Sequence, residues 1–146
     1  MGKANKVSRR PHTKKKPKKK QKKTSKNNKS LKKSFKTCLD DLGSSDVLLL
    51  KIYADWCIHC QNMKTEWEHL SLKTKPHVII KELEESKDSN EISVVLRKLK
   101  YNDSFGFPTI IFVCKKNKNF IYKRYEGERT SNGFNKFIED CKKTVK

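Results

Sequence analysis

The chain has 146 residues and carries 36 Lys or Arg against 16 Asp or Glu, a formal net charge of +20. This length fits one ordinary domain, because a single hydrophobic core usually serves about 100 to 200 residues. A membrane-spanning helix is excluded, because it needs about 18 consecutive apolar residues. The longest apolar run here is residues 110–114.

The positive charge is concentrated at the amino-terminal end. Residues 1–37 carry 17 Lys or Arg and no Asp or Glu, whereas residues 38–146 carry 19 basic and 16 acidic side chains. Residues 1–30 have almost no apolar side chain to bury, so nothing offsets the entropy lost on ordering. We therefore predict a disordered Lys-rich basic tail over residues 1–30 and one domain over residues 31–146.

The tail has three candidate roles. It is a solvated, solubilising charge run, a nuclear import signal, or a site for nucleic acid or another polyanion over residues 1–37. Its cations are not interleaved with aromatic residues, which favours attraction to phosphate over recognition of bases. Anionic membrane is a weaker alternative, because no lipidation motif or amphipathic anchor accompanies the charge.

The start of the chain and its composition also bear on where the protein works. No apolar stretch of a secretory signal follows the basic start, so we expect an intracellular protein of the cytoplasm or nucleus. Lys, Asn and Ile supply 50 of the 146 residues and Ala only two, which is typical of AT-rich coding. An AT-rich protist or a large DNA virus fits this composition, and a viral protein of this kind would be packaged in the virion.

Behind the tail, helices and strands alternate. The apolar spacing predicts a first helix over residues 31–42, with Gly43 as its C-terminal cap. Residues 47–53 are an apolar run with one Lys, which predicts a buried strand. A helix follows over residues 58–72, and Pro76 closes that segment. The apolar face of this helix is Cys60, Met63, Trp67 and Leu70.

The second half of the domain ends in a hairpin and a helix. A strand is predicted over residues 77–83, and Asp88 with Glu91 resembles a capping box opening another helix. Residues 109–114 and 120–125 read as two strands of a hairpin. A last helix begins at Ser131 or Asn132. Its apolar stripe is Phe134, Phe137, Ile138, Cys141 and Val145. This order predicts an α/β domain, a mixed sheet with helices on both faces.

The residues with the clearest chemistry are Cys57 and Cys60. Cys57 is expected at a strand end and in the first turn of a helix, where unpaired N–H groups stabilise a thiolate. It is therefore predicted to be the attacking sulfur, with Cys60, one helical turn later, as the resolving cysteine. A protonated His59 between them would favour the thiolate and so make the oxidised pair a stronger oxidant.

The same pair is also half of a zinc site. A tetrahedral structural site needs four ligands, however, and the remaining cysteines Cys38, Cys114 and Cys141 are isolated along the sequence. We expect those three to be small buried apolar side chains. Redox chemistry is thus preferred over a metal site, with an inactive, degenerate fold as a further alternative, and no cofactor is expected.

Three segments resemble the thioredoxin family. Residues 53–60 (YADWCIHC) resemble its active-site segment, and the Cys-x-His-Cys form is most similar to protein disulfide isomerase domains. Residues 105–109 (FGFPT) are similar to its cis-proline loop, and residues 125–130 resemble its last strand and the start of its last helix. The resemblance covers about residues 31 to 144. It implies a thioredoxin fold and a monomeric dithiol–disulfide oxidoreductase acting on protein thiols or disulfides.

The resemblance also implies roles for matching residues. The two cysteines would be nucleophile and resolver and would form the redox disulfide, with Trp56 as a flat surface beside them. Pro108, in cis, would hold the Phe107 backbone where it pairs with an extended substrate strand. Arg129 occupies the place of an isomerase arginine that approaches the pair and assists proton release.

The sequence departs from the family pattern at three places. Lys51 stands where the family usually has a buried acid that accepts the second thiol's proton, and a charged Lys cannot accept one. We predict a reversed pair, Lys51 with Glu82 or Glu84. Thr65 replaces a helix-kinking proline, which predicts a straighter helix. The basic tail takes the place of the family's first strand.

Overall fold

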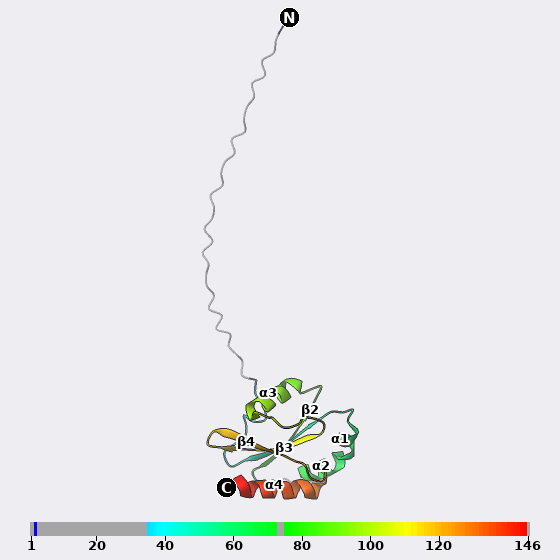
Figure 1. Cartoon of the computed structure of the whole chain (residues 1–146), viewed down its shortest axis with the longest axis vertical. Coiled ribbons are helices and arrows are strands. Elements are labelled where there is room, and N and C mark those ends of the chain that lie inside the picture. Colours follow the sequence, from blue (N-terminus) through cyan, green and yellow to red (C-terminus); the bar gives the residue numbers. More distant parts are fainter. Residues whose placement is uncertain (1, 3–34, 73–74, 146) are drawn as a thin grey trace. The chain divides into compact units, whose positions relative to one another are not determined.

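The computed structural model describes Gly2, residues 35–72 and residues 75–145 (Figure 1). The disordered tail predicted over residues 1–30, and most of the expected polyanion-binding segment over residues 1–37, lie outside the described residues. Within residues 35–72 and 75–145, no helix is both long and apolar enough to cross a membrane.

A mixed four-stranded sheet forms the centre of the domain. The strands are β1 (Val47–Tyr53), β2 (Val78–Glu84), β3 (Thr109–Lys116) and β4 (Asn119–Arg124). Their order is β2-β1-β3-β4, with β1 parallel to β2 and antiparallel to β3, and with β3 and β4 joined as a hairpin. The mixed sheet and the hairpin are thus confirmed, and the predicted strand bounds are within two residues of those observed.

Helices cover both faces of this sheet. They are α1 (Ile58–Asn62), α2 (Lys64–Leu72), α3 (Ser89–Leu99) and α4 (Ser131–Val145). Because side chains alternate along a strand, β1 sends Leu48, Leu50 and Ile52 toward the α3 cluster and Val47 and Leu49 toward the α2 and α4 cluster. Figure 1 shows α3 on one side of the sheet and α2 with α4 on the other. The prediction of helices on both faces is confirmed.

The helix predicted over residues 31–42 is wrong for its described part. Residues 38–41 form turns instead, with Asp40 N donating to Thr37 O at 3.0 Å. The Asp40 carboxylate also accepts bonds from Thr37 N at 2.7 Å and Thr37 Oγ1 at 2.9 Å. These local bonds compete with a helical ladder. Leu39 and Leu42 are nevertheless buried, whereas Phe35 of the same apolar spacing is 50% exposed, so the spacing marks core residues only in part.

Asp40 gives this turn a pH dependence. Lys98 Nζ lies 2.7 Å from Asp40 Oδ1, and Lys98 together with Thr37 lowers the pKa of Asp40 to about 2. A lowered folded pKa stabilises the fold above pH ~4, and this stabilisation is lost as the pH falls toward ~2. The pair is partly exposed, so we expect Asp40→Asn to cost less than about 1 kcal/mol at pH 7.

Urea unfolding between pH 2 and pH 7 measures this effect. The stability difference between wild type and Asp40→Asn should shrink on acidification. The matched control is Asp41→Asn, whose carboxylate pairs with the exposed Lys36. A constant difference across the pH range would contradict the assignment to Asp40.

Three further predictions about the helices are wrong in detail. The helix predicted over residues 58–72 is broken at Met63, whose φ of −91° and ψ of −2° end α1 before α2 begins. A straighter helix does not follow from Thr65. The capping box is absent because Asp88 instead accepts from Glu84 N at 2.8 Å and Glu91 accepts from Cys38 N at 2.7 Å.

Candidate functional site

Cys57 lies where the central strand passes into a helix. β1 ends at Tyr53, and Ala54 O accepts a bond from Cys57 N at 3.0 Å, which turns the chain sharply. Cys57 then caps α1 with an extended backbone, φ −81° and ψ 113°. The predicted placement at a strand end and a helix start is therefore confirmed.

The sulfur of Cys57 has two close partners. Cys60 N donates to Cys57 Sγ at 3.3 Å, and the Cys57 thiol donates to Phe107 O at 3.4 Å. The peptide bond between Phe107 and Pro108 is cis, as expected. Both cysteines are free thiols, buried to 6% and 5% exposure. The structure thus brings the two thiols and the proline loop together.

The thiol of Cys60 has a raised pKa. Burial raises the pKa of its thiol to about 11, and the neighbouring Cys57 adds to this effect, whereas a bond from Ala54 and the charge of Lys51 oppose it. At neutral pH Cys60 therefore holds its proton. Attack by this sulfur requires that the proton leave first.

Exposed apolar side chains lie next to Cys57 in the sequence and around the ring of Phe107. Trp56 is 73% exposed and its ring meets that of Phe107 edge to face at 5.8 Å. The Phe107 ring also meets Phe105 at 5.5 Å, and Ile58 and Phe105 are themselves 60% and 47% exposed. Sequence reasoning missed Phe105 and Ile58 as site residues. The sequence did hold a signal for each. Phe105 is an apolar residue in a polar loop, Ile58 lies beside the cysteine pair, and neither belongs to an apolar stripe predicted for the core.

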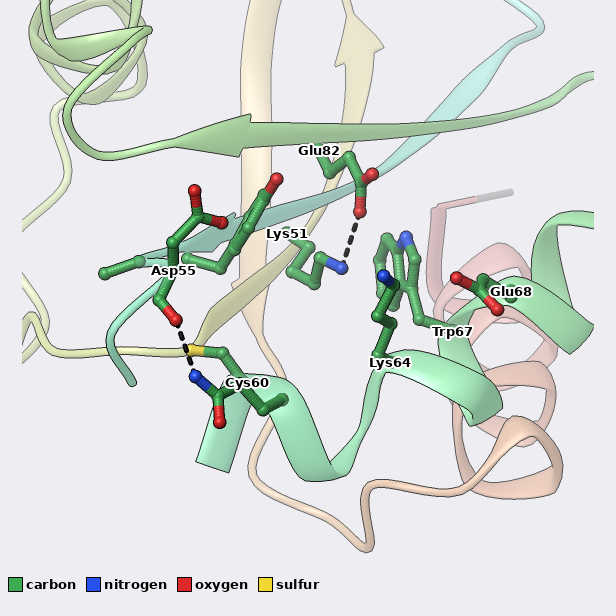
Figure 2. A pocket seen from close by; sticks show the side chains of 10 residues that line it. Lys51, Asp55, Cys60, Lys64, Trp67, Glu68 and Glu82 are labelled. Atoms are coloured by element: carbon green, nitrogen blue, oxygen red, sulfur yellow. Dashed lines mark hydrogen bonds and ion pairs between the residues drawn. The ribbon is translucent and has the colours of Figure 1, made fainter. Parts of the chain in front are cut away.

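Lys51 is buried behind the second thiol. Its side chain points into a cavity of about 190 Å³ that Cys60 also lines, and Figure 2 shows it directed toward Glu82. Lys51 Nζ lies 2.5 Å from Glu82 Oε2, and it lies 4.6 Å and 4.9 Å from the ring centroids of Tyr53 and Trp67. The predicted reversed pair exists, with Glu82 as the partner.

Glu84 is not the partner of Lys51. Its buried carboxylate accepts bonds from Ser86 Oγ at 2.6 Å, from Lys87 N at 2.9 Å and from Asp55 N at 3.5 Å. The Ser86 bond is the main reason that the pKa of Glu84 is lowered. Glu84 therefore ties the loop before Cys57 to the end of β2.

Two other predicted site residues are exposed. His59 is exposed on α1 between the two cysteines. Arg129 is exposed and lines a separate cavity of about 240 Å³ together with Pro108 and Tyr125. Their influence on the thiols stays a prediction.

Comparison with known proteins agrees with this geometry. A family model described as Thioredoxin matches residues 26–140. The chain is 33% identical over 94 residues to a candidate protein disulfide-isomerase of Schizosaccharomyces pombe. This match covers 63% of this chain and 17% of that protein. It is 31% identical over 93 residues to the protein disulfide-isomerase of Gallus gallus, with 63% and 16% coverage. The chain thus spans about one sixth of the length of these relatives.

A solved structure is similar in shape. The Trx4 domain of ERdj5 superposes with a TM-score of 0.55 at 16% identity, over 69% of this chain and 83% of that one. At this identity the likeness shows the fold alone.

Proposed function

The chain belongs to the thioredoxin family and has its fold, and from this membership we propose that it is a thiol–disulfide oxidoreductase of the isomerase type that acts on protein thiols. One observation carries the proposal. The sulfur of Cys57 is held at a helix start, within 3.3 Å of the Cys60 N–H group and 3.4 Å of the Phe107 carbonyl.

In the proposed reaction, two electrons pass from the two thiols to a substrate disulfide. The Cys57 thiolate attacks one substrate sulfur, a mixed disulfide forms, and the other substrate sulfur leaves as a thiolate that takes up a proton. Cys60 then loses its proton and attacks Cys57 Sγ. The Cys57–Cys60 disulfide forms, the mixed disulfide breaks, and the second substrate thiolate leaves. An external thiol restores the reduced pair, and the reverse sequence oxidises substrate thiols.

The surroundings of Cys57 favour a protein substrate with apolar side chains. The exposed Trp56 ring packs edge to face against the half-buried Phe107 ring, and large aromatic rings bury apolar partners effectively. Extended peptide segments that expose apolar residues fit this surface. Insulin reduction by the wild type and by the Cys57→Ser variant tests the function.

We propose a second function for the basic segment, namely non-specific binding of nucleic acid or another polyanion. The observation that favours it is the charge of residues 1–37, 17 basic and no acidic side chains. Binding through phosphate neutralisation weakens with salt, with a log-log slope of roughly 0.9 per phosphate on duplex DNA.

A filter-binding titration of duplex DNA between ~50 and ~200 mM salt checks this second function. The full chain should lose affinity by at least about a hundredfold over this range, if five or more phosphates are neutralised. A chain lacking residues 1–37 should not bind at the lower salt concentration. Equal binding by both chains would contradict the assignment to this segment.

A further inference from the structure

The buried ion pair behind Cys60 is the feature that the proposed reaction leaves unused. Lys51 is 4% exposed in the middle of β1, and β2 places Glu82 directly opposite it. A buried ammonium group is costly unless it is paired. Here one carboxylate and the faces of two aromatic rings contact the Lys51 ammonium group and offset part of the cost of its burial.

The cavity joins this pair to the second thiol. Lys51, Glu82 and Cys60 all line it, and Figure 2 shows Cys60 below Lys51 with Trp67 beside the ammonium group. The remaining charged or titratable groups that line the cavity are Tyr53, Asp55, Lys64 and Glu68. Asp55 is exposed and pairs with Lys87 at 3.1 Å. Of the two lysines that line the cavity, Lys64 is exposed and Lys51 is buried.

We propose that Lys51, held in place by Glu82, is a positioning residue that stabilises the thiolate of Cys60 and so sets the rate of the resolving step. The inference rests on the proposed function. When Cys60 gives up its proton to water, negative charge appears on Sγ, and a nearby fixed ammonium lowers the free energy of that state.

The direction of the charge effect agrees with this role. The charge of Lys51 lowers the pKa of the Cys60 thiol, against burial and the Cys57 sulfur, which raise it. Glu82 neutralises part of the Lys51 charge. The two members of the pair should therefore act on the resolving step in opposite directions.

Reaction with 5,5′-dithiobis(2-nitrobenzoate) separates the two steps. One 2-nitro-5-thiobenzoate leaves when Cys57 attacks the reagent, and the second leaves when Cys60 attacks the mixed disulfide. Stopped-flow absorbance of the full chain between pH 6 and pH 11 records both phases. The Cys60→Ser variant should lack the second phase. This comparison distinguishes the reaction of Cys60 from the reaction of the other cysteines with the reagent.

Removal of the positive charge should slow only the second phase. In Lys51→Met we expect the pH midpoint of the second-phase rate to move to higher pH. The second-phase rate at pH 7 should fall by about tenfold, since one unit of pKa changes the thiolate fraction tenfold. The first phase should stay within twofold. Lys51→Arg keeps the charge and should restore the midpoint. A Lys51→Met protein with the wild-type midpoint would overturn the proposal.

The Glu82→Gln variant gives an independent test, because Glu82 is half exposed and its replacement keeps the shape of the side chain. Its midpoint should move to lower pH and its second phase should accelerate at pH 7. An unchanged or higher midpoint would overturn the proposal, even if Lys51→Met does not fold. The control is Glu85→Gln, an exposed carboxylate outside the cavity, which should leave the profile unchanged. If the wild type showed no second phase, this result would instead contradict the proposed function itself.

Discussion

The Cys57→Ser variant should lose insulin reduction almost completely, falling more than about 100-fold to the rate given by dithiothreitol alone. A serine hydroxyl at this position cannot open a disulfide, because the reaction needs a thiolate both as nucleophile and as a partner in the new sulfur–sulfur bond. Turbidity of reduced insulin measures the loss. The fold should be retained, since serine preserves the size of the side chain at the start of α1.

The Cys60→Ser variant distinguishes the two sulfurs. Its Cys57 still attacks, but no second thiol resolves the mixed disulfide, so covalent complexes with substrate should accumulate on non-reducing gels. Cys38→Ser is a matched control, because this cysteine is partly buried beside α3 and away from the pair. It should keep wild-type activity. Equal activity in wild type and Cys57→Ser would leave the fold as a scaffold and favour the polyanion-binding function.

The position of Lys51 illustrates how far the sequence alone reaches. A single Lys in an apolar run predicts a buried cation, and the alternation of side chains along a strand places Glu82 and Glu84 on one face of β2. The choice between them depends on the register of two parallel strands, which sets Lys51 opposite Glu82 and Tyr53 opposite Glu84. Register arises from the packing of the whole sheet, so the sequence leaves both partners open.

The strand bounds could be predicted from the local sequence, whereas the turn at residues 38–41 and the start of α3 could not. β1 is an apolar run with a single polar member, and such a run specifies its own bounds. The turn at residues 38–41 and the start of α3 depend on side chains that find partners elsewhere: Asp40 pairs with Lys98, and Glu91 accepts from Cys38 N. These contacts join residues more than fifty positions apart. A local pattern such as a capping box cannot reveal them.

The Phe134→Ala variant should show the largest loss of stability, about 3 to 5 kcal/mol. Phe134 is fully buried in α4, where its ring meets Trp67 at 5.5 Å and Tyr125 at 5.2 Å, both edge to face. Alanine removes the apolar area and these ring contacts and leaves a cavity between α4 and α2. Since domains of this size are stable by only about 5 to 15 kcal/mol, the variant should unfold at much lower urea concentration.

Urea unfolding followed by tryptophan fluorescence measures this loss, because Trp67 lies against Phe134. The matched control is Phe35→Ala, the same substitution at a side chain that is 50% exposed, and it should cost less than about 1 kcal/mol. Equal losses in the two variants would contradict the assignment of Phe134 to the core. Trp67 also lies 4.9 Å from Lys51 Nζ, so this core contact supports the cavity behind Cys60 as well. A milder Phe134→Leu variant should therefore keep both the fold and the second kinetic phase.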